Sequence, residues 1–274
     1  MIVNGWDFGD IGLGTAQFAF KDVDERQAID TIRAGLADGI RLIDTALAYT
    51  RPGSVSYAEH IVRLALAGID SDDVLVATKG GHFRNGDSFP VDGTRATLRA
   101  HCEISLATLG VERIDLYQLH RVDPFVPIGE SVAALAELQA EGKVKWIGVS
   151  NVSLEQLWEA ASITSITSVQ NELSFHHRDD PRVIDYCRDN GMAYLAYAPL
   201  GGPDLSVGQV SDARAEIARE RGVSWQRVTL AWLRALDPCI LPLVGSSRPG
   251  TIRDSAEDLR LDAPELARLN TEHP

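Results

Sequence analysis

Short apolar runs alternate with longer amphipathic stretches along almost the whole chain, and this alternation constrains the fold more than any other feature. The runs are rich in Val, Ile, Leu and Tyr, which is typical of strands, and the stretches between them carry apolar residues at helical spacing. The predicted strands are residues 11–13, 42–45, 74–78, 116–119, 146–149, 168–170, 193–197 and 240–244. The predicted helices are residues 24–38, 56–67, 93–109, 127–141, 181–190, 212–221 and 224–236, and a Ser-x-x-Gln capping box at Ser153 marks a further helix start.

Eight strands that alternate with helices predict a parallel sheet, because parallel neighbours need crossover connections. Closing eight such units gives an α/β fold of the TIM (β/α)8 barrel type, and we expect residues 1–274 to form a single domain. An open doubly wound sheet is the structural alternative, and its usual sign is a glycine-rich turn between the first strand and its helix. The nearest match, residues 9–14, precedes Thr15 and no evident helix, so the barrel is favoured.

The charge of the chain restricts its partners. Its 274 residues include 26 basic and 39 acidic residues, for a net charge of -13. Nucleic acids and anionic membranes bind basic faces, so neither is expected as a partner. The N-terminus has neither a basic start nor an apolar signal core, and we expect a cytoplasmic protein that is a monomer by default. The three cysteines are far apart and are expected to be buried apolar residues.

Polar residues gather where the predicted strands end. Asp44 ends the second strand, Lys79 follows the third, His120 follows the fourth, and Tyr49 comes five residues after Asp44. The carboxyl ends of barrel strands meet at one face, where the active sites of barrel enzymes lie. A phenol has a pKa of about 10, and a neighbouring ammonium makes it a better acid. With a carboxylate to hold the ammonium and an imidazole to orient an oxygen, this set suits the reduction of a carbonyl.

Eight segments in order along the chain resemble the aldo-keto reductase family over nearly its full length. The matching segments are residues 12–15, 44–49, 77–79, 117–124, 148–151, 169–171, 197–201 and 242–249. The resemblance implies that Tyr49 is the general acid in reduction, that Lys79 lowers its pKa, and that Asp44 holds Lys79. It also implies that His120 orients a small-molecule carbonyl substrate.

The resemblance implies NADPH as the cofactor, because no side chain can supply a hydride. Ser150, Asn151 and Gln170 would bind the carboxamide, Tyr197 would stack on the nicotinamide, and residues 199–205 would cover the pyrophosphate. Ser246 and Arg248 would hold the 2′-phosphate, although Arg248 as a plain surface residue stays an alternative. The implied cofactor contacts are Gly14, Thr15, Asp44, Ser150, Asn151, Gln170, Tyr197, Pro199, Leu200, Gly201, Gly245, Ser246, Arg248 and Asp254.

Two departures from the family pattern leave choices open. The positions of a second arginine and an asparagine in the phosphate site read Thr251 and Ser255, so NADH stays possible. Ala16 stands where many members carry Trp, and Phe18 or Phe20 could supply the aromatic wall. We expect Phe18 and Arg121 to line the substrate pocket with Tyr49 and His120.

No metal site is expected, because adjacent histidines such as His176 and His177 point apart and no third ligand is evident. Three other functions stay open. The chain could be an NAD-dependent alcohol or sugar dehydrogenase, a nucleotide-sensing regulatory subunit with little turnover, or a lyase in which Lys79 forms a Schiff base.

Overall fold

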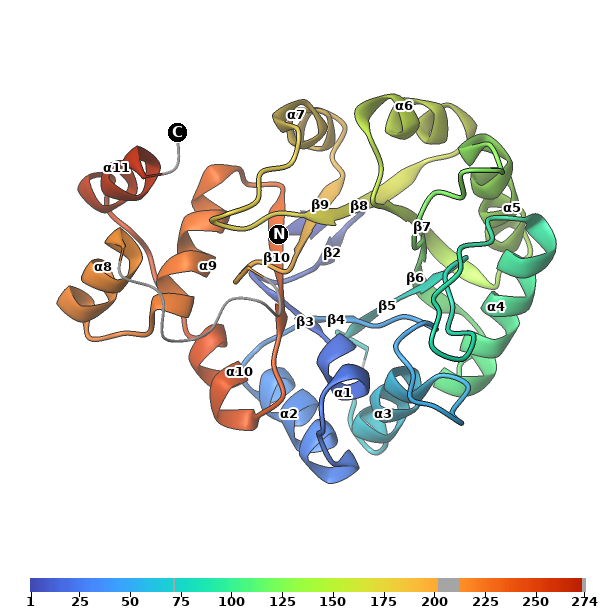
Figure 1. Cartoon of the computed structure of the whole chain (residues 1–274), viewed down its shortest axis with the longest axis horizontal. Helices are drawn as coiled ribbons and strands as arrows, with labels where there is room; N and C mark the ends of the chain where they lie inside the picture. Colours follow the sequence, from blue (N-terminus) through green and yellow to red (C-terminus); the bar gives the residue numbers. More distant parts are fainter. Residues whose placement is uncertain (71, 202–211, 273–274) are drawn as a thin grey trace.

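A closed barrel of eight parallel strands forms the centre of the molecule (Figure 1). The computed structural model describes residues 1–70, 72–201 and 212–272. The barrel strands are β3 (Gly12–Gly14), β4 (Leu42–Asp44), β5 (Leu75–Gly80), β6 (Ile114–Leu119), β7 (Val144–Ser150), β8 (Ile166–Glu172), β9 (Ala193–Tyr197) and β10 (Ile240–Gly245). The last strand, β10, pairs with the first, β3, which closes the barrel, so the prediction of a barrel rather than an open sheet is confirmed.

Helices surround the strands (Figure 1). They are α1 (Ala16–Phe20), α2 (Glu25–Ala37), α3 (Tyr57–Leu66), α4 (Arg95–Leu109), α5 (Ile128–Ala140), α6 (Leu154–Ile163), α7 (Pro181–Asp189), α8 (Ala213–Arg221), α9 (Trp225–Leu236), α10 (Pro249–Ala256) and α11 (Ala263–Thr271). All seven helices predicted by range lie within about two residues of their expected ends. The capping box at Ser153 also begins α6 as predicted, with both hydrogen bonds formed.

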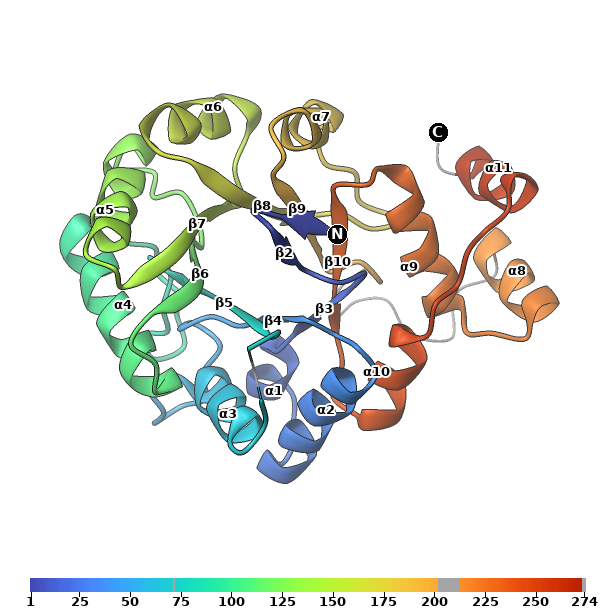
Figure 2. The same cartoon turned by 180° about the vertical axis from the view of Figure 1, so that it is seen from behind.

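An N-terminal hairpin of β1 (Ile2–Val3) and β2 (Trp6–Asp7) was not predicted, because each strand has only two residues. Figure 2 shows this hairpin inside the ring of strands when the molecule is viewed from behind. Val3 and Phe8 pack against Leu42, Leu75 and Leu116 from the barrel interior. The hairpin therefore fills the end of the barrel at which the strands begin.

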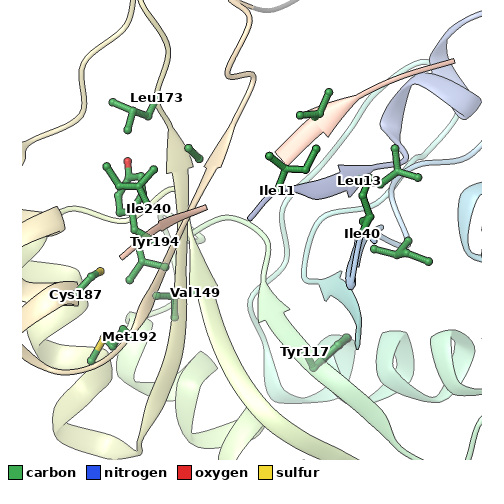
Figure 3. Close-up of a cluster of buried hydrophobic side chains, with 14 of the residues drawn as sticks. Ile11, Leu13, Ile40, Tyr117, Val149, Leu173, Cys187, Met192, Tyr194 and Ile240 are labelled. Carbon is green, nitrogen blue, oxygen red and sulfur yellow. The ribbon is translucent and has the colours of Figure 1, made fainter. Parts of the chain in front are cut away.

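A second hydrophobic cluster fills the space between the barrel strands and the helices. Figure 3 shows part of it, with Val149, Tyr194 and Ile240 from the strands near Cys187 of α7. Cys102, Cys187 and Cys239 are free and buried, which confirms the prediction of apolar packing. Burial raises the pKa of the thiols of Cys102 and Cys187 to about 12, so these groups are unreactive near neutral pH.

Within the described ranges, no helix has the length and apolar character needed to cross a bilayer.

Candidate active site

A buried lysine links a carboxylate to a phenol at the carboxyl ends of β4 and β5. Nζ of Lys79 lies 2.7 Å from each carboxylate oxygen of Asp44 and 2.9 Å from the main-chain oxygen of Thr45. The same nitrogen lies 3.5 Å from the hydroxyl oxygen of Tyr49. Lys79 is fully buried, so its charge depends on Asp44 for compensation. The three side chains predicted to act together are thus brought together.

The pKa values of this cluster follow from burial and charge. Burial disfavours the ammonium of Lys79, but Asp44 and Tyr49 outweigh that effect and raise the pKa of Lys79 above its ordinary value. Burial also raises the pKa of Tyr49, while the charge of Lys79 acts in the opposite direction. The influence of Lys79 therefore has the expected sign, but a pKa of Tyr49 below its ordinary value is not found, because desolvation is larger.

His120 lies beside Tyr49 at the end of β6. Their rings meet edge to face with centroids 5.6 Å apart. Burial, followed by the charges of Lys79 and other neighbours, holds the pKa of His120 well below its usual range. The imidazole is therefore neutral at physiological pH. Its Nδ1 is buried without a hydrogen-bond partner among the described residues, so no hydrogen bond of this atom fixes the tautomer of the ring.

These groups face a cavity of about 560 Å³. The predicted site residues that line it are Gly14, Asp44, Tyr49, His120, Arg121, Ser150, Asn151, Gln170, Tyr197, Pro199, Leu200 and Gly245. Thr15 lies beneath this surface, where its hydroxyl donates to the main-chain oxygen of Asp44 at 3.0 Å. Gly201 lies at the end of the described segment with φ of 100°, and residues 202–205 of the predicted pyrophosphate segment lie outside the described residues.

The polar residues of the cavity wall hold one another in place. Nδ2 of Asn151 donates to the main-chain oxygen of His120 and to the hydroxyl of Ser150, both at 3.0 Å. The hydroxyl of Tyr197 donates to Oδ1 of Asn151 at 2.8 Å. Asn151 also has φ of 57°, a left-handed conformation that asparagine tolerates. The wall thus presents fixed amide and hydroxyl groups from the ends of neighbouring strands.

The prediction that Phe18 lines the pocket is wrong. Its side chain is fully buried in the hydrophobic core, since it lies on the inner face of α1. Phe20, two residues later, is 52% exposed and lines the cavity. On a short helix, residues two apart face different directions. Of the two aromatic residues considered for the cavity wall, Phe20 is therefore the one that reaches it.

Five rings form a closed circuit of contacts in the cavity wall. Phe20 contacts Tyr49, Tyr49 contacts His120, His120 contacts His82, His82 contacts Phe89, and Phe89 contacts Phe20. The centroid separations range from 5.0 Å for the histidine pair to 6.0 Å for Phe20 and Tyr49. His82 and Phe89 were missed from the sequence. The position of His82 three residues after Lys79 was the available signal.

The predicted phosphate residues lie beside the cavity, around the start of α10. Ser246 is buried, and its hydroxyl donates to the main-chain oxygen of Arg248 at 3.1 Å. Arg248 is exposed at the N-cap of α10. The carboxylate of Asp254 accepts a hydrogen bond from Ser224, which ties α10 to α9. Asp254 therefore has a structural partner, and only Gly245 of this group lines the cavity.

Comparison with known proteins decides the family. The model of the aldo/keto reductase family matches residues 10–271. The chain belongs to the aldo/keto reductase family. As a member, it is an NAD(P)-dependent oxidoreductase that acts on carbonyl or alcohol groups, and the family uses NADPH.

Individual relatives are similar to this chain over nearly its whole length. The chain is 34% identical to pyridoxine 4-dehydrogenase of Escherichia coli, with 95% of this chain and 93% of that protein covered. Among solved structures, an aldo/keto reductase from Klebsiella pneumoniae in complex with NADP and acetate matches at 28% identity with a TM-score of 0.81, covering 96% of this chain and 90% of that one. Glycerol dehydrogenase from Gluconobacter oxydans matches at 26% identity with a TM-score of 0.83, covering 99% and 94%.

Proposed function

We propose that this aldo/keto reductase uses NADPH to reduce an aldehyde or ketone to the alcohol, with Tyr49 as the general acid. The observation that carries the proposal is the position of Lys79, whose ammonium lies between Asp44 and the hydroxyl of Tyr49 beneath the cavity. Nicotinamide, when bound, supplies the hydride. The chain supplies the proton, orients the carbonyl and stabilises the oxygen on which negative charge develops.

Each residue of the cluster has a distinct proposed role. The phenol of Tyr49 donates its proton to the carbonyl oxygen, and the ammonium of Lys79 stabilises the phenolate that remains. Asp44 keeps Lys79 charged and fixed. Because His120 is neutral and faces the cavity, its ring orients the carbonyl without competing for the proton of Tyr49. The reverse order of these steps oxidises an alcohol.

The donor set of the wall fits the cofactor. Ser150, Asn151 and Gln170 lie at one side of the cavity, where the hydroxyl of Ser150, the amide of Gln170 and the remaining lone pair of Oδ1 of Asn151 would meet the carboxamide of nicotinamide. Tyr197 would stack on the ring. The main chain at Gly14, Thr15 and residues 199–201 would contact the nicotinamide and the pyrophosphate. Gly245, Ser246 and Arg248 would hold the 2′-phosphate, next to the N-terminus of α10.

NADH is the second cofactor to test. Arg253, the other arginine near this position, lies 3.6 Å from Asp38, and Asp254 is bound to Ser224. Ser255 is buried. Arg248 therefore carries most of the proposed phosphate contact, and a site with one arginine discriminates less strongly between the two cofactors.

A Schiff base on Lys79 is disfavoured by the same geometry. A lysine nucleophile needs a depressed pKa in an apolar site, whereas Asp44 and Tyr49 raise the pKa of Lys79. A nucleotide-sensing subunit would bind nucleotide tightly with negligible turnover. The experiment below tests the sensor, and borohydride trapping of a carbonyl substrate on Lys79 tests the Schiff base.

The deciding experiment measures nucleotide binding and turnover on one preparation. Protein fluorescence is titrated with NADPH and NADH, and absorbance at about 340 nm is then followed with a panel of aldehydes. Pyridoxine and glycerol, the alcohols named for two relatives, are tested in the oxidative direction. We expect tight NADPH binding and consumption with at least one aldehyde. Binding without turnover of any substrate would overturn the proposal in favour of a sensor.

We also propose that the chain is a single domain and a monomer. The acidic surface implied by the net charge of -13 opposes self-association at low ionic strength. Light scattering should give the mass of one chain, and denaturant unfolding should show one cooperative transition.

A further inference from the structure

We propose that the carbonyl substrate carries a carboxylate, and that Arg121 binds it. The inference rests on the proposed function, because it names the substrate class of the same cavity. The carboxylate does not react. The carbonyl carbon gains a hydride, with its two electrons, from the reduced nicotinamide, and the carbonyl oxygen gains a proton from Tyr49. The product is therefore a hydroxy acid whose carboxylate is unchanged.

The first argument is the charge of the cavity. The whole protein has a net charge of -13, yet among the described residues the charged side chains that line this cavity are those of Lys21, Asp44 and Arg121. Asp44 is neutralised by its contact of 2.7 Å with Lys79. The part of the lining that the structure describes is therefore cationic in an acidic protein, and field focusing in a cleft draws anions toward it.

The second argument is the state of Arg121. Its side chain is exposed, and within residues 1–70, 72–201 and 212–272 it forms no salt bridge or hydrogen bond. Its charge lowers the pKa values of four ring-bearing residues around the reacting position, namely Tyr49, His82, His120 and Tyr197. Arg121 also follows His120 directly in the chain. An anion on the substrate would thus lie close to the carbonyl that His120 orients.

The third argument is that the ring-bearing side of the wall, formed by His82, Phe20 and Phe89, cannot hold a carboxylate. Nδ1 of His82 lies 3.1 Å from the main-chain oxygen of Pro90, which only accepts, so Nδ1 carries the proton. Burial and the charge of Arg121 lower the pKa of His82, so this ring stays neutral. Its Nε2 is then an acceptor, which repels a carboxylate. Phe20 and Phe89 offer only apolar surface.

A carboxylate fits this site better than a phosphate ester does. The planar fork of one guanidinium matches the two oxygens of one carboxylate. A phosphate dianion carries twice the charge and is usually held by several cations or by a helix N-terminus. With Arg121 as the single arginine among the described residues of the cavity lining, a monoanion is the better match.

The test uses pairs of aldehydes that differ only in charge. The three formylbenzoates and the matching formylbenzamides have the same shape, so the ratio of their kcat/KM values isolates the carboxylate. We expect a ratio of about ten or more for at least one isomer, the value of one charge-assisted hydrogen bond. Arg121→Gln should bring this ratio to about one, mainly through KM, since the charge of the carboxylate is the same in the ground state and the transition state and so contributes uniform binding.

Two controls make the result specific. Arg26→Gln removes the same charge from α2, at a side chain that is 93% exposed, and should keep the wild-type ratio. KM for the carboxylate should rise with ionic strength in the wild type, and Arg121→Gln should remove this dependence.

The outcomes separate the two proposals. Turnover of the amides with a ratio near one, or an equal ratio in Arg121→Gln, overturns the carboxylate inference while the reductase assignment stands. Loss of the ratio in Lys21→Gln alone overturns the assignment to Arg121. No turnover of any aldehyde, despite nucleotide binding, overturns the reductase proposal and this inference with it.

Discussion

Nε2 of Gln170 donates a hydrogen bond to Oδ1 of Asp44 at 2.7 Å. The two residues lie on β8 and β4, which are on opposite sides of the barrel. The same carboxylate oxygen accepts from Lys79 at 2.7 Å. The barrel interior thus fixes Asp44 from two directions, and Gln170, expected only at the cofactor, is also a structural partner of the proposed catalytic cluster.

Asp44→Asn should both inactivate and destabilise the protein. Asparagine keeps the shape but leaves the ammonium of Lys79 buried without a counter-charge, and breaking a buried pair in this way costs about 3–5 kcal/mol. Denaturant unfolding measures the loss. Asp38→Asn, which removes the same charge from a partly exposed pair with Arg253, is the control and should change stability by less than about 1 kcal/mol. Equal effects of the two substitutions would contradict the role of Asp44.

The pH dependence should follow the phenol of Tyr49. Burial raises the pKa of Tyr49 above its ordinary value of about 10, so the protonated form persists at neutral pH. Reduction needs that proton, so kcat/KM should stay level through neutral pH and fall only above the raised pKa. Alcohol oxidation needs the phenolate and should rise with pH over the same range.

Tyr49→Phe tests the same role by removing the hydroxyl. Reduction should fall roughly 10²–10⁴-fold. Nucleotide binding, followed by fluorescence, should remain and shows that the fold survives. Retention of near wild-type reduction would refute the role of Tyr49 as the acid.

Phe18 and Phe20 should respond in opposite ways to replacement by alanine. Phe18→Ala leaves a hole in the core and should cost about 3–5 kcal/mol of unfolding free energy. Phe20→Ala removes a half-exposed ring from the cavity wall, so stability should change little while KM values across a panel of aldehydes change. Unfolding curves and steady-state kinetics on both variants distinguish the two roles. Unchanged kinetics in Phe20→Ala would count against its place in the substrate wall.

Gly80→Ala should disturb the strand that carries Lys79. A Cβ at Gly80 would lie 2.0 Å from the hydroxyl oxygen and 2.8 Å from Cζ of Tyr117, a fully buried ring. Overpacking of this kind costs about 1–3 kcal/mol, and the shift should also lower kcat. Gly250→Ala, on α10 with no atom within 4 Å of the new Cβ, is the control and should be neutral or slightly stabilising. Wild-type stability in Gly80→Ala would show that Tyr117 can move aside.

The barrel was predictable because its signals are local and repeated. Each strand was found within a few residues, and Asp44, Lys79 and His120 were placed at strand ends that meet. The hairpin of β1 and β2 was not, since two-residue strands have no readable period. The directions in which Phe18 and Phe20 point depend on the residue at which the five-residue helix α1 begins. The spacing of apolar residues alone does not determine that residue. His82 and Phe89 reach the cavity through the path of the chain between β5 and α4, and apart from the closeness of His82 to Lys79 in the chain no sequence pattern encodes that path.

The five rings come from two kinds of position. Two of them directly depend on the barrel strands, and three lie on the connecting segments that follow β3 and β5. Tyr49 and His120 depend on the barrel, because they follow β4 and β6. Tyr49 contacts the buried Lys79, and His120 contacts Tyr49. Phe20, His82 and Phe89 come from the connections after β3 and β5, where insertions and exchanges are tolerated. Random changes at these three positions could therefore generate new substrate preferences without loss of the proton donor. A directed-evolution library for new substrates needs to vary only Phe20, His82 and Phe89.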